Sequence, residues 1–161
     1  MHFNRCAVTI RRYPTAFARC TISSMSSEPE PPSLFSSRSF IHHVSLNVKD
    51  IERSIEFYEG QLGLKRIAAP MAYPGRILAW FDLGSGQQLH LQQSVEVPGE
   101  PEAIDTRMNH FSVAVDDIEE ARAFVASLGK APMNYGGNAT FVGQTFLTDP
   151  DGHILEISQP R

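Results

Sequence analysis

The sequence predicts an α+β fold of two βαβββ modules in tandem, whose strands form a curved mixed sheet around a cup. The first observation is a repeat: the segment that begins at His43 recurs from His110, an offset of 67 residues. Seven of fifteen aligned positions are identical, where average residue usage would give about one. The second observation is that each copy passes from an alternating strand pattern to a helical one. The third is that three further strand-like segments follow each copy, so one supersecondary unit occurs twice.

The first module opens with a strand over residues 41–48 and a helix after it. Polar and apolar residues alternate in the strand, so His43 lies on a polar face and Val44 on an apolar one. Asp50 is placed to cap the helix, because its carboxylate can accept from the free N–H groups of the first turn. Residues at helical spacing then predict a buried stripe of Ile51, Ile55, Tyr58 and Leu62.

Three more strands complete this module, at about residues 64–69, 77–83 and 87–92. Ser85 and Gly86 form the predicted hairpin turn between the last two. On the final strand His90 alternates with Leu89 and Leu91. His90 therefore lies on the polar face, opposite to the side that meets the helix.

The second module repeats this order after an acidic connector at residues 93–107. Its first strand begins at His110, and Asp117 is the predicted cap of its helix. Strands are expected at about residues 131–135, 141–148 and 153–158, with a tight turn in the Asp-Pro-Asp-Gly sequence before the last. Glu156 lies on the polar side of the closing strand.

Four potential metal ligands occupy equivalent polar-face positions in the two modules. His43 and His110 lie on the first strands, and His90 and Glu156 lie on the last strands, 66 residues apart. If the modules pair about a pseudo-twofold axis, these side chains can converge. Three imidazoles and a carboxylate suit a divalent transition metal, so the pattern predicts a metal site. His42 adjoins His43 and is expected to point to the opposite face.

Two phrases, HHVSLNVKDIERSIEFYEGQLGL and TDPDGHILEIS, resemble the best-marked segments of the vicinal oxygen chelate superfamily. That superfamily includes glyoxalase I, fosfomycin-resistance enzymes, bleomycin-binding proteins and extradiol dioxygenases. The resemblance covers about residues 40–159 and implies the glyoxalase-like fold. It also implies Zn, Ni, Fe, Co or Mn as the metal, with ligands from the first and last strands of the modules: His43, His90, His110 and Glu156.

The resemblance implies a lyase or isomerase that acts on a small oxygenated substrate through a metal-stabilised enediolate. Glu156 would then serve as both ligand and catalytic base. Glyoxalase-type members usually carry Glu or Gln where this chain has His90. An Fe(II) extradiol-type dioxygenase is therefore the first alternative, with His43, His110 and Glu156 as its ligands.

A second alternative is a non-catalytic module that binds a drug or toxin and confers resistance. Bleomycin-binding members generally lack the metal ligands, so the four retained here argue against a pure binder. Side chains expected near the cup, and assigned to substrate binding, are Arg76, Tyr135 and Gln144. Trp80 is a further candidate for this role, although a position in the core is favoured for it.

Composition limits the partners of this chain. The net charge is −4, and residues 1–27 hold four arginines and no acid, which leaves the remainder at −8. An acidic domain disfavours nucleic acid and anionic membranes as partners. No apolar run approaches the roughly 18 residues of a membrane helix. Both cysteines, Cys6 and Cys20, precede the fold, which excludes a thiolate site in it.

Three regions are expected along the chain. Residues 1–27 have the Arg- and Ser-rich composition of a transit peptide, which favours mitochondrial import, with a disordered tail as the other interpretation. Met25 is an alternative start that would give a cytoplasmic product. Residues 28–39 read as a Pro/Ser linker, and residues 40–161 form the folded domain, with modules at about 40–92 and 108–159. The modules pair either within one chain or across a homodimer.

Overall fold

The computed structural model describes residues 39–130 and 132–161 of the 161-residue chain. The predicted transit peptide and nearly all of the linker lie outside the described residues. The first module contains β1 (His43–Val48), α1 (Ile51–Ile55), a π-helix (Glu56–Gln61), β2 (Lys65–Ile67), β3 (Leu78–Gly84) and β4 (Gln87–Gln93). The second contains β5 (His110–Ala114), α2 (Ile118–Ser127), β6 (Met133–Tyr135), β7 (Phe141–Thr148) and β8 (Ile154–Pro160).

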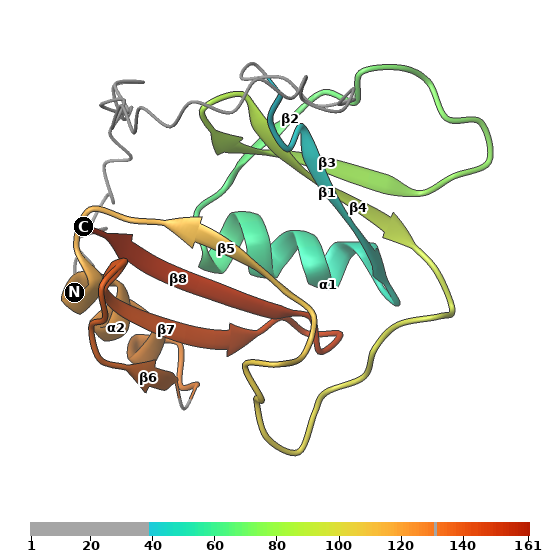
Figure 1. The fold of residues 1–161 in the computed structure, drawn as a ribbon. Helices are drawn as coiled ribbons and strands as arrows, with labels where there is room; N and C mark the ends of the chain where they lie inside the picture. The colour runs from blue at the N-terminus through green and yellow to red at the C-terminus, as the bar shows by residue number, and fades with distance from the viewer. Residues whose placement is uncertain (1–38, 131) are drawn as a thin grey trace, which may run out of the picture.

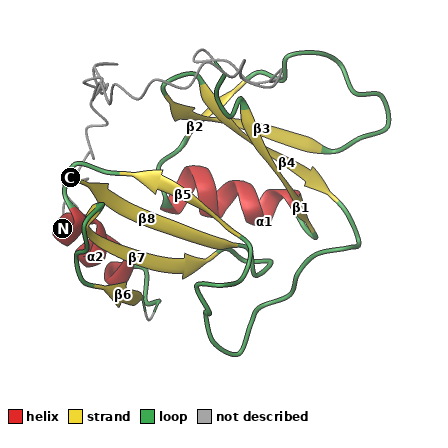
Figure 2. Cartoon of the chain, in the orientation of Figure 1, coloured by secondary structure: helices red, strands yellow, loops and turns green. Residues whose placement is uncertain are grey.

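The two modules have the same topology, which confirms the predicted tandem βαβββ fold. Each forms a mixed four-stranded sheet, with strand orders β1-β4-β3-β2 and β5-β8-β7-β6. The first and last strands of each module pair in parallel, and the other pairs are antiparallel. Figures 1 and 2 show the two sheets as separate layers with α1 between them. Strands β1 and β5 each lie at the end of a sheet.

The first helix differs from the single α-helix that the sequence predicts. Asp50 caps it as expected, accepting from the backbone N–H groups of Glu52 and Arg53. After Ile55 the chain widens into the π-helix, and the N–H of Leu62 donates to the carbonyl of Phe57, five residues back. Phe57 and its neighbour Tyr58 are both buried, at 2% and 0% exposure. A π segment is usually a local bulge at a site under packing demand, and here two adjacent aromatic side chains both enter the core.

One hydrophobic core joins the two modules. Its buried members come from both helices and both sheets: Val48, Ile51, Ile55, Phe57, Tyr58, Ala79, Phe81, Leu89, Leu91, Val125, Leu147 and Leu155. Because strand side chains alternate between faces, the polar face of each sheet is turned away from this shared core. The apolar backs therefore face the inside of the chain, and the two polar faces point outward.

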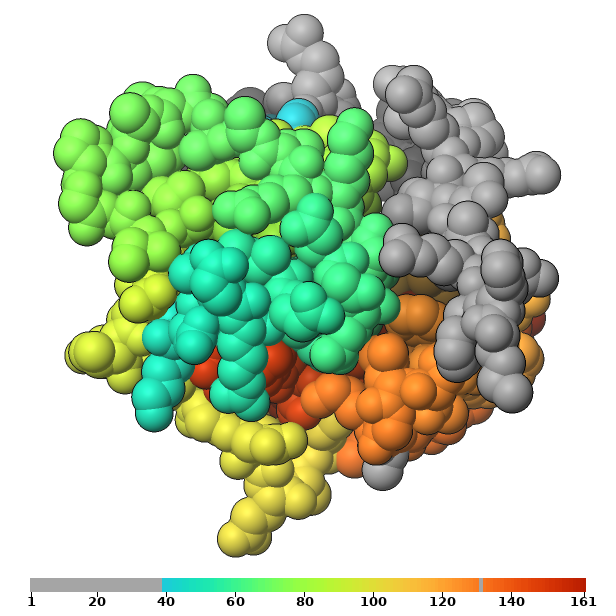
Figure 3. Space-filling model, turned by 180° about the vertical axis from the view of Figure 1, so that it is seen from behind, coloured from blue at the N-terminus to red at the C-terminus, as the bar shows by residue number. Residues whose placement is uncertain are grey.

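The turn between β7 and β8 fastens the second module to the first. Tyr58 Oη donates to a carboxylate oxygen of Asp149 at 3.0 Å, and the backbone N–H of Lys49 donates to Asp151 at 3.1 Å. His153 Nε2 donates to the carbonyl of Asn47 at 2.7 Å. Asp149 and Asp151 are 1% and 5% exposed, so this junction is a buried polar network. In Figure 3 atoms of the C-terminal part of the chain (red) are visible next to those of the first helical region (teal).

The connector between the modules is held against the same turn. The N–H of Gly99 donates to the carbonyl of Asp151 at 2.9 Å. Gly152 has φ of 87°, and a Cβ atom there would lie 2.0 Å from the carbonyl oxygen of Gly99. Only glycine fits this crossing of two chain segments. Among the described residues, no helix is long and apolar enough to cross a membrane.

Candidate functional site

The first half of the candidate site is a histidine pair on the polar face of the first sheet. His43 on β1 and His90 on the adjacent β4 have ring centroids 6.2 Å apart. His90 is only 6% exposed, because the indole ring of Trp80 stacks on it at 4.2 Å and 13°. His43 lies at the end of this stack, 5.3 Å from Trp80, and is exposed.

The pKa of His90 is shifted toward the neutral imidazole, which is the form that binds a metal. Burial lowers the pKa of its imidazole, and the positive charges of His43 and Arg76 lower it further. Its Nε2 atom is buried and has no hydrogen-bond partner among the described residues. A buried polar nitrogen without a partner is costly, which makes this atom a candidate contact for a metal or a ligand.

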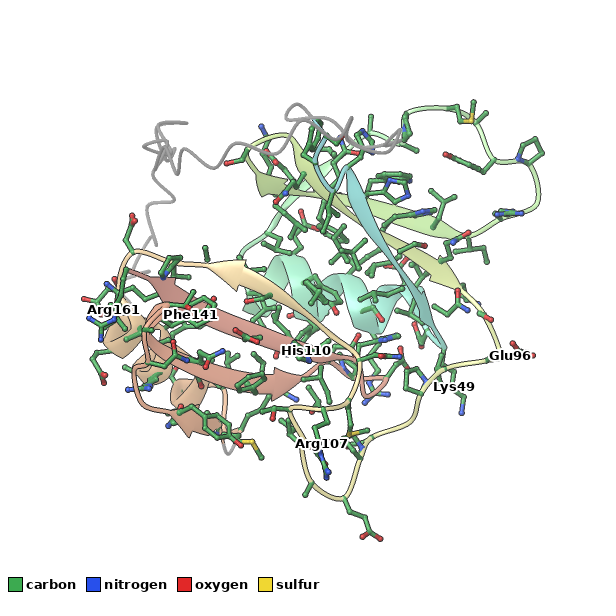
Figure 4. The ribbon with its side chains drawn as sticks, in the orientation of Figure 1. Lys49, Glu96, Arg107, His110, Phe141 and Arg161 are labelled. Atoms are coloured by element: carbon green, nitrogen blue, oxygen red, sulfur yellow. The ribbon has the colours of Figure 1, made fainter. Side chains whose placement is uncertain are left out.

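The second half of the site is a histidine–carboxylate pair on the polar face of the second sheet. His110 Nε2 lies 3.1 Å from a carboxylate oxygen of Glu156, which is 5% exposed. His110 Nδ1 donates to the carbonyl of Met108 at 2.8 Å, which orients the ring. Figure 4 labels His110 on β5, with Arg107 in the connector before it. Gln144 on β7 donates to the other oxygen of Glu156 at 2.7 Å.

The distance within this second pair is that of a direct hydrogen bond or ion pair, and it is also compatible with two neighbouring ligands on one metal. With metal–ligand bonds of about 2.1 Å, adjacent donors of an octahedral shell lie about 3.0 Å apart. The 3.1 Å between His110 and Glu156 matches that spacing. Both donors also have outer partners, a backbone carbonyl and an amide, as metal-binding His and Glu residues usually do.

The four predicted ligands come together as two pairs within one chain, without forming one cluster. Over residues 39–130 and 132–161, no group of three or more His, Cys, Asp or Glu residues is arranged to hold a metal. The physical reason is the shared core, which turns the two polar faces away from each other. A site with all four ligands therefore requires an arrangement that brings the two polar faces together, which the packing within one chain does not do.

The remaining candidates lie around the two pairs. Arg76 donates through Nη1 to Gln92 Oε1 at 3.1 Å, on the same face as His90. Tyr135 is 44% exposed and lies 5.8 Å from Phe146, whose ring is 5.7 Å from His110. Gln144 contacts Glu156 directly.

Two features of the first pair are not apparent from the sequence pattern. Trp80 is buried at 3%, as a core residue would be, but it covers the polar face and contacts both histidines. Trp80 lies directly opposite His90 on the paired strands β3 and β4, and this register explains why it covers the polar face. His42 Nδ1 lies 3.0 Å from His43 Nδ1, because the chain before β1 is irregular and does not continue the alternation.

Comparisons with known proteins agree with this architecture. The chain is 28% identical over 128 residues to a lactoylglutathione lyase of Neisseria meningitidis, covering 74% of this chain and 89% of that protein. It is 30% identical over 121 residues to a probable trivalent organoarsenical cleaving enzyme of Bacillus subtilis, covering 71% of this chain and 76% of that protein. The crystal structure of a glyoxalase family protein from Bacillus anthracis superimposes with a TM-score of 0.66 at 18% identity, covering 80% of this chain and 100% of that one. Residues 40–157 match the model of one family, so the chain belongs to the Glyoxalase/Bleomycin resistance protein/Dioxygenase superfamily.

Proposed function

We propose that this protein is a divalent-metal-dependent enzyme of glyoxalase-like type, a lyase or isomerase acting on a small oxygenated substrate. The observation that carries the proposal is the His110–Glu156 pair, whose donor atoms are spaced as neighbouring metal ligands. The unpartnered Nε2 of His90 supports it from the other module. The lactoylglutathione lyases among the relatives supply the reaction class.

The residues that would hold the metal are His43, His90, His110 and Glu156. The metal would act as a Lewis acid that stabilises negative charge developing on two neighbouring substrate oxygens. Glu156 would accept the proton next to the substrate carbonyl, since its carboxylate is buried in the same pair. Gln144 would hold that carboxylate in position through the bond it already makes.

We further propose that each metal centre is built from two chains. The pairs point away from each other within a chain. Over the part of the chain that the structure describes, β1 and β5 end their sheets and pair with a strand on one side only. A twofold dimer can place the first-module face of one chain against the second-module face of its partner. Both half-sites of each chain are then used, and two identical centres form per dimer.

Mixing two inactive variants tests this arrangement. H43A damages only the first module and H110A only the second, so each homodimer lacks a complete centre. A mixed dimer contains one intact centre, and random exchange of subunits should restore about one quarter of the wild-type metal content and turnover. Metal analysis and hemithioacetal isomerisation, measured before and after denaturing and refolding the mixture, provide the readout. No recovery, with both variants folded and dimeric, would show that the centre does not form between chains.

A dioxygenase is the second candidate function, because His43, His110 and Glu156 form the two-histidine, one-carboxylate set of non-haem Fe(II) oxygenases. The description of the matching family, which includes dioxygenases, supports this candidate. Substrate-dependent oxygen uptake by Fe(II)-loaded protein with a catechol panel would favour it. Turnover of a hemithioacetal without oxygen uptake would favour the lyase or isomerase.

A further inference from the structure

A cavity lies on the polar face of the first sheet, beyond the histidine pair. Its volume is about 360 Å³. Its lining comes from β1, the loop that leads into β3, β4 and the start of the connector after β4: Asn47, Gly75, Arg76, Ile77, Gln92, Gln93 and Ser94. Arg76 is the only charged residue in this lining. The cavity is therefore a polar pocket that carries one positive charge.

The guanidinium of Arg76 is positioned but not neutralised. Its Nη1 donates to Gln92 Oε1 at 3.1 Å, and Gln92 Nε2 donates to Ser45 Oγ at 2.9 Å. Both ends of the Gln92 amide are thus engaged, which keeps its carbonyl directed at Arg76. No ion pair to Arg76 is found in the part of the chain that the structure describes. Arg76 is exposed at the edge of this pocket and has no carboxylate partner among the described residues, so its guanidinium is accessible to an anion.

The pocket shares its face with the proposed metal ligands. Gln92 follows His90 by two residues on β4, so their side chains emerge on the same face about 7 Å apart. One substrate can therefore span the histidine pair and the guanidinium.

We propose that Arg76 is a specificity-determining residue that binds a carboxylate at the far end of the substrate. The chelating oxygens of the same molecule would lie at the metal site, so this assignment rests on the proposed function for that end. Guanidinium has five N–H donors, one of which goes to Gln92, and the rest can grip a planar carboxylate in a forked pair. A phosphate dianion fits less well, because the pocket offers one cation and otherwise neutral groups.

Hydroxamates test the proposal, because they present two neighbouring oxygens to a metal and accept a tail of chosen length. Full-length protein loaded with Zn²⁺ is titrated calorimetrically with acetohydroxamate and with hydroxamates that carry three to five methylenes ending in a carboxylate or a primary amide. The best carboxylate should bind at least about tenfold more tightly than its amide. Arg76→Gln should remove that preference, and Arg76→Lys should retain only part of it. Arg53→Gln, which removes an equal charge from the exposed side of α1, should leave the preference unchanged.

The outcomes separate the two proposals. Equal binding of carboxylate and amide to the wild type, or a preference that survives in Arg76→Gln, would overturn the assignment of Arg76. Failure of acetohydroxamate to bind any variant would instead contradict the metal site. In that case the binding of glutarate, which has no hydroxamate group, is measured on metal-free protein. Binding that is lost in Arg76→Gln supports carboxylate binding by Arg76. Binding that is absent in the wild type, or unchanged in the variant, contradicts it. Thermal unfolding of each variant confirms that the fold is retained.

Discussion

At the scale of single residues, the environment of Glu156 bears on the two roles that we propose for its carboxylate, metal ligand and base. One of its oxygens faces His110 and the other accepts from Gln144. A buried carboxylate needs such partners, because an unpaired charge in a protein interior is costly. The amide of Gln144 fixes the direction of the carboxylate.

Gln144→Ala should weaken metal binding by about 10- to 100-fold, as is typical when an outer hydrogen-bond partner of a ligand is removed. The reason is that Glu156 would lose the donor that orients it. Metal affinity is measured by competition with a chromophoric chelator. The control is Gln61→Ala, an exposed glutamine of the π-helix, which should bind metal as the wild type does. Equal affinities for both variants would contradict a positioning role for Gln144.

At the scale of elements, the two helices begin in the same way. Asp50 and Asp117 have extended backbones, and each accepts from the second and third N–H groups of its helix. The carboxylate also interacts favourably with the positive end of the helix. These caps set the direction in which each helix leaves its strand, and hence which face of the strand remains open.

Asp117→Ala should lower the free energy of unfolding by about 1 kcal/mol, because two N–H groups lose their acceptor. The matched control is Asp116→Ala, one position earlier and also exposed, which should change stability by less than about 0.5 kcal/mol. Urea denaturation monitored by circular dichroism measures both. A loss of equal size at Asp116 would indicate a general charge effect in place of capping.

Most elements could be predicted because their signals are local. The alternation of polar and apolar residues around His43 and His110 predicts the two strands. The capping aspartates that follow predict where the helices begin. The π segment could not be predicted, since helical spacing of Ile51, Ile55 and Tyr58 does not reveal that Phe57 is also buried. The position of Trp80 was equally hidden, because its burial comes from a histidine ring on another strand.

At the scale of the whole molecule, the packing of the modules decides whether the predicted ligands meet. The alternation of polar and apolar residues places His43, His90, His110 and Glu156 on the polar faces of the sheets. The apolar faces of the two sheets could pack against each other in more than one way, and the alternation does not distinguish between these. The junction around Asp149 shows which packing the chain adopts. Its contacts link residues about 90 to 106 positions apart, which no local pattern can reveal.

Stability should depend on pH through Asp149. Burial raises the pKa of this carboxyl, although hydrogen bonds from His153 and Tyr58 oppose the shift. The folded state therefore holds its proton more tightly than the unfolded state, and stability falls as pH rises from the ordinary aspartate value to the raised one. Asp149→Asn cannot ionise, so its stability relative to the wild type should increase across that window and level off above it. Urea midpoints of both proteins between pH 4 and 7 measure the difference, and a constant difference would contradict the shift.

The crossing of Gly99 and Gly152 has a consequence for how this chain can vary in length. The bond from Gly99 to Asp151 divides the connector between β4 and β5 into a short span of residues 94–98 and a longer one of residues 100–109. The short span is held at one end by β4 and at the other by the hydrogen bond from Gly99 to Asp151. An added residue there must form a bulge or break that hydrogen bond. The longer span can absorb insertions at low cost, because closure entropy grows slowly with loop length. Related chains should therefore differ in length mainly between Glu100 and Asn109, close to where His110 enters the site.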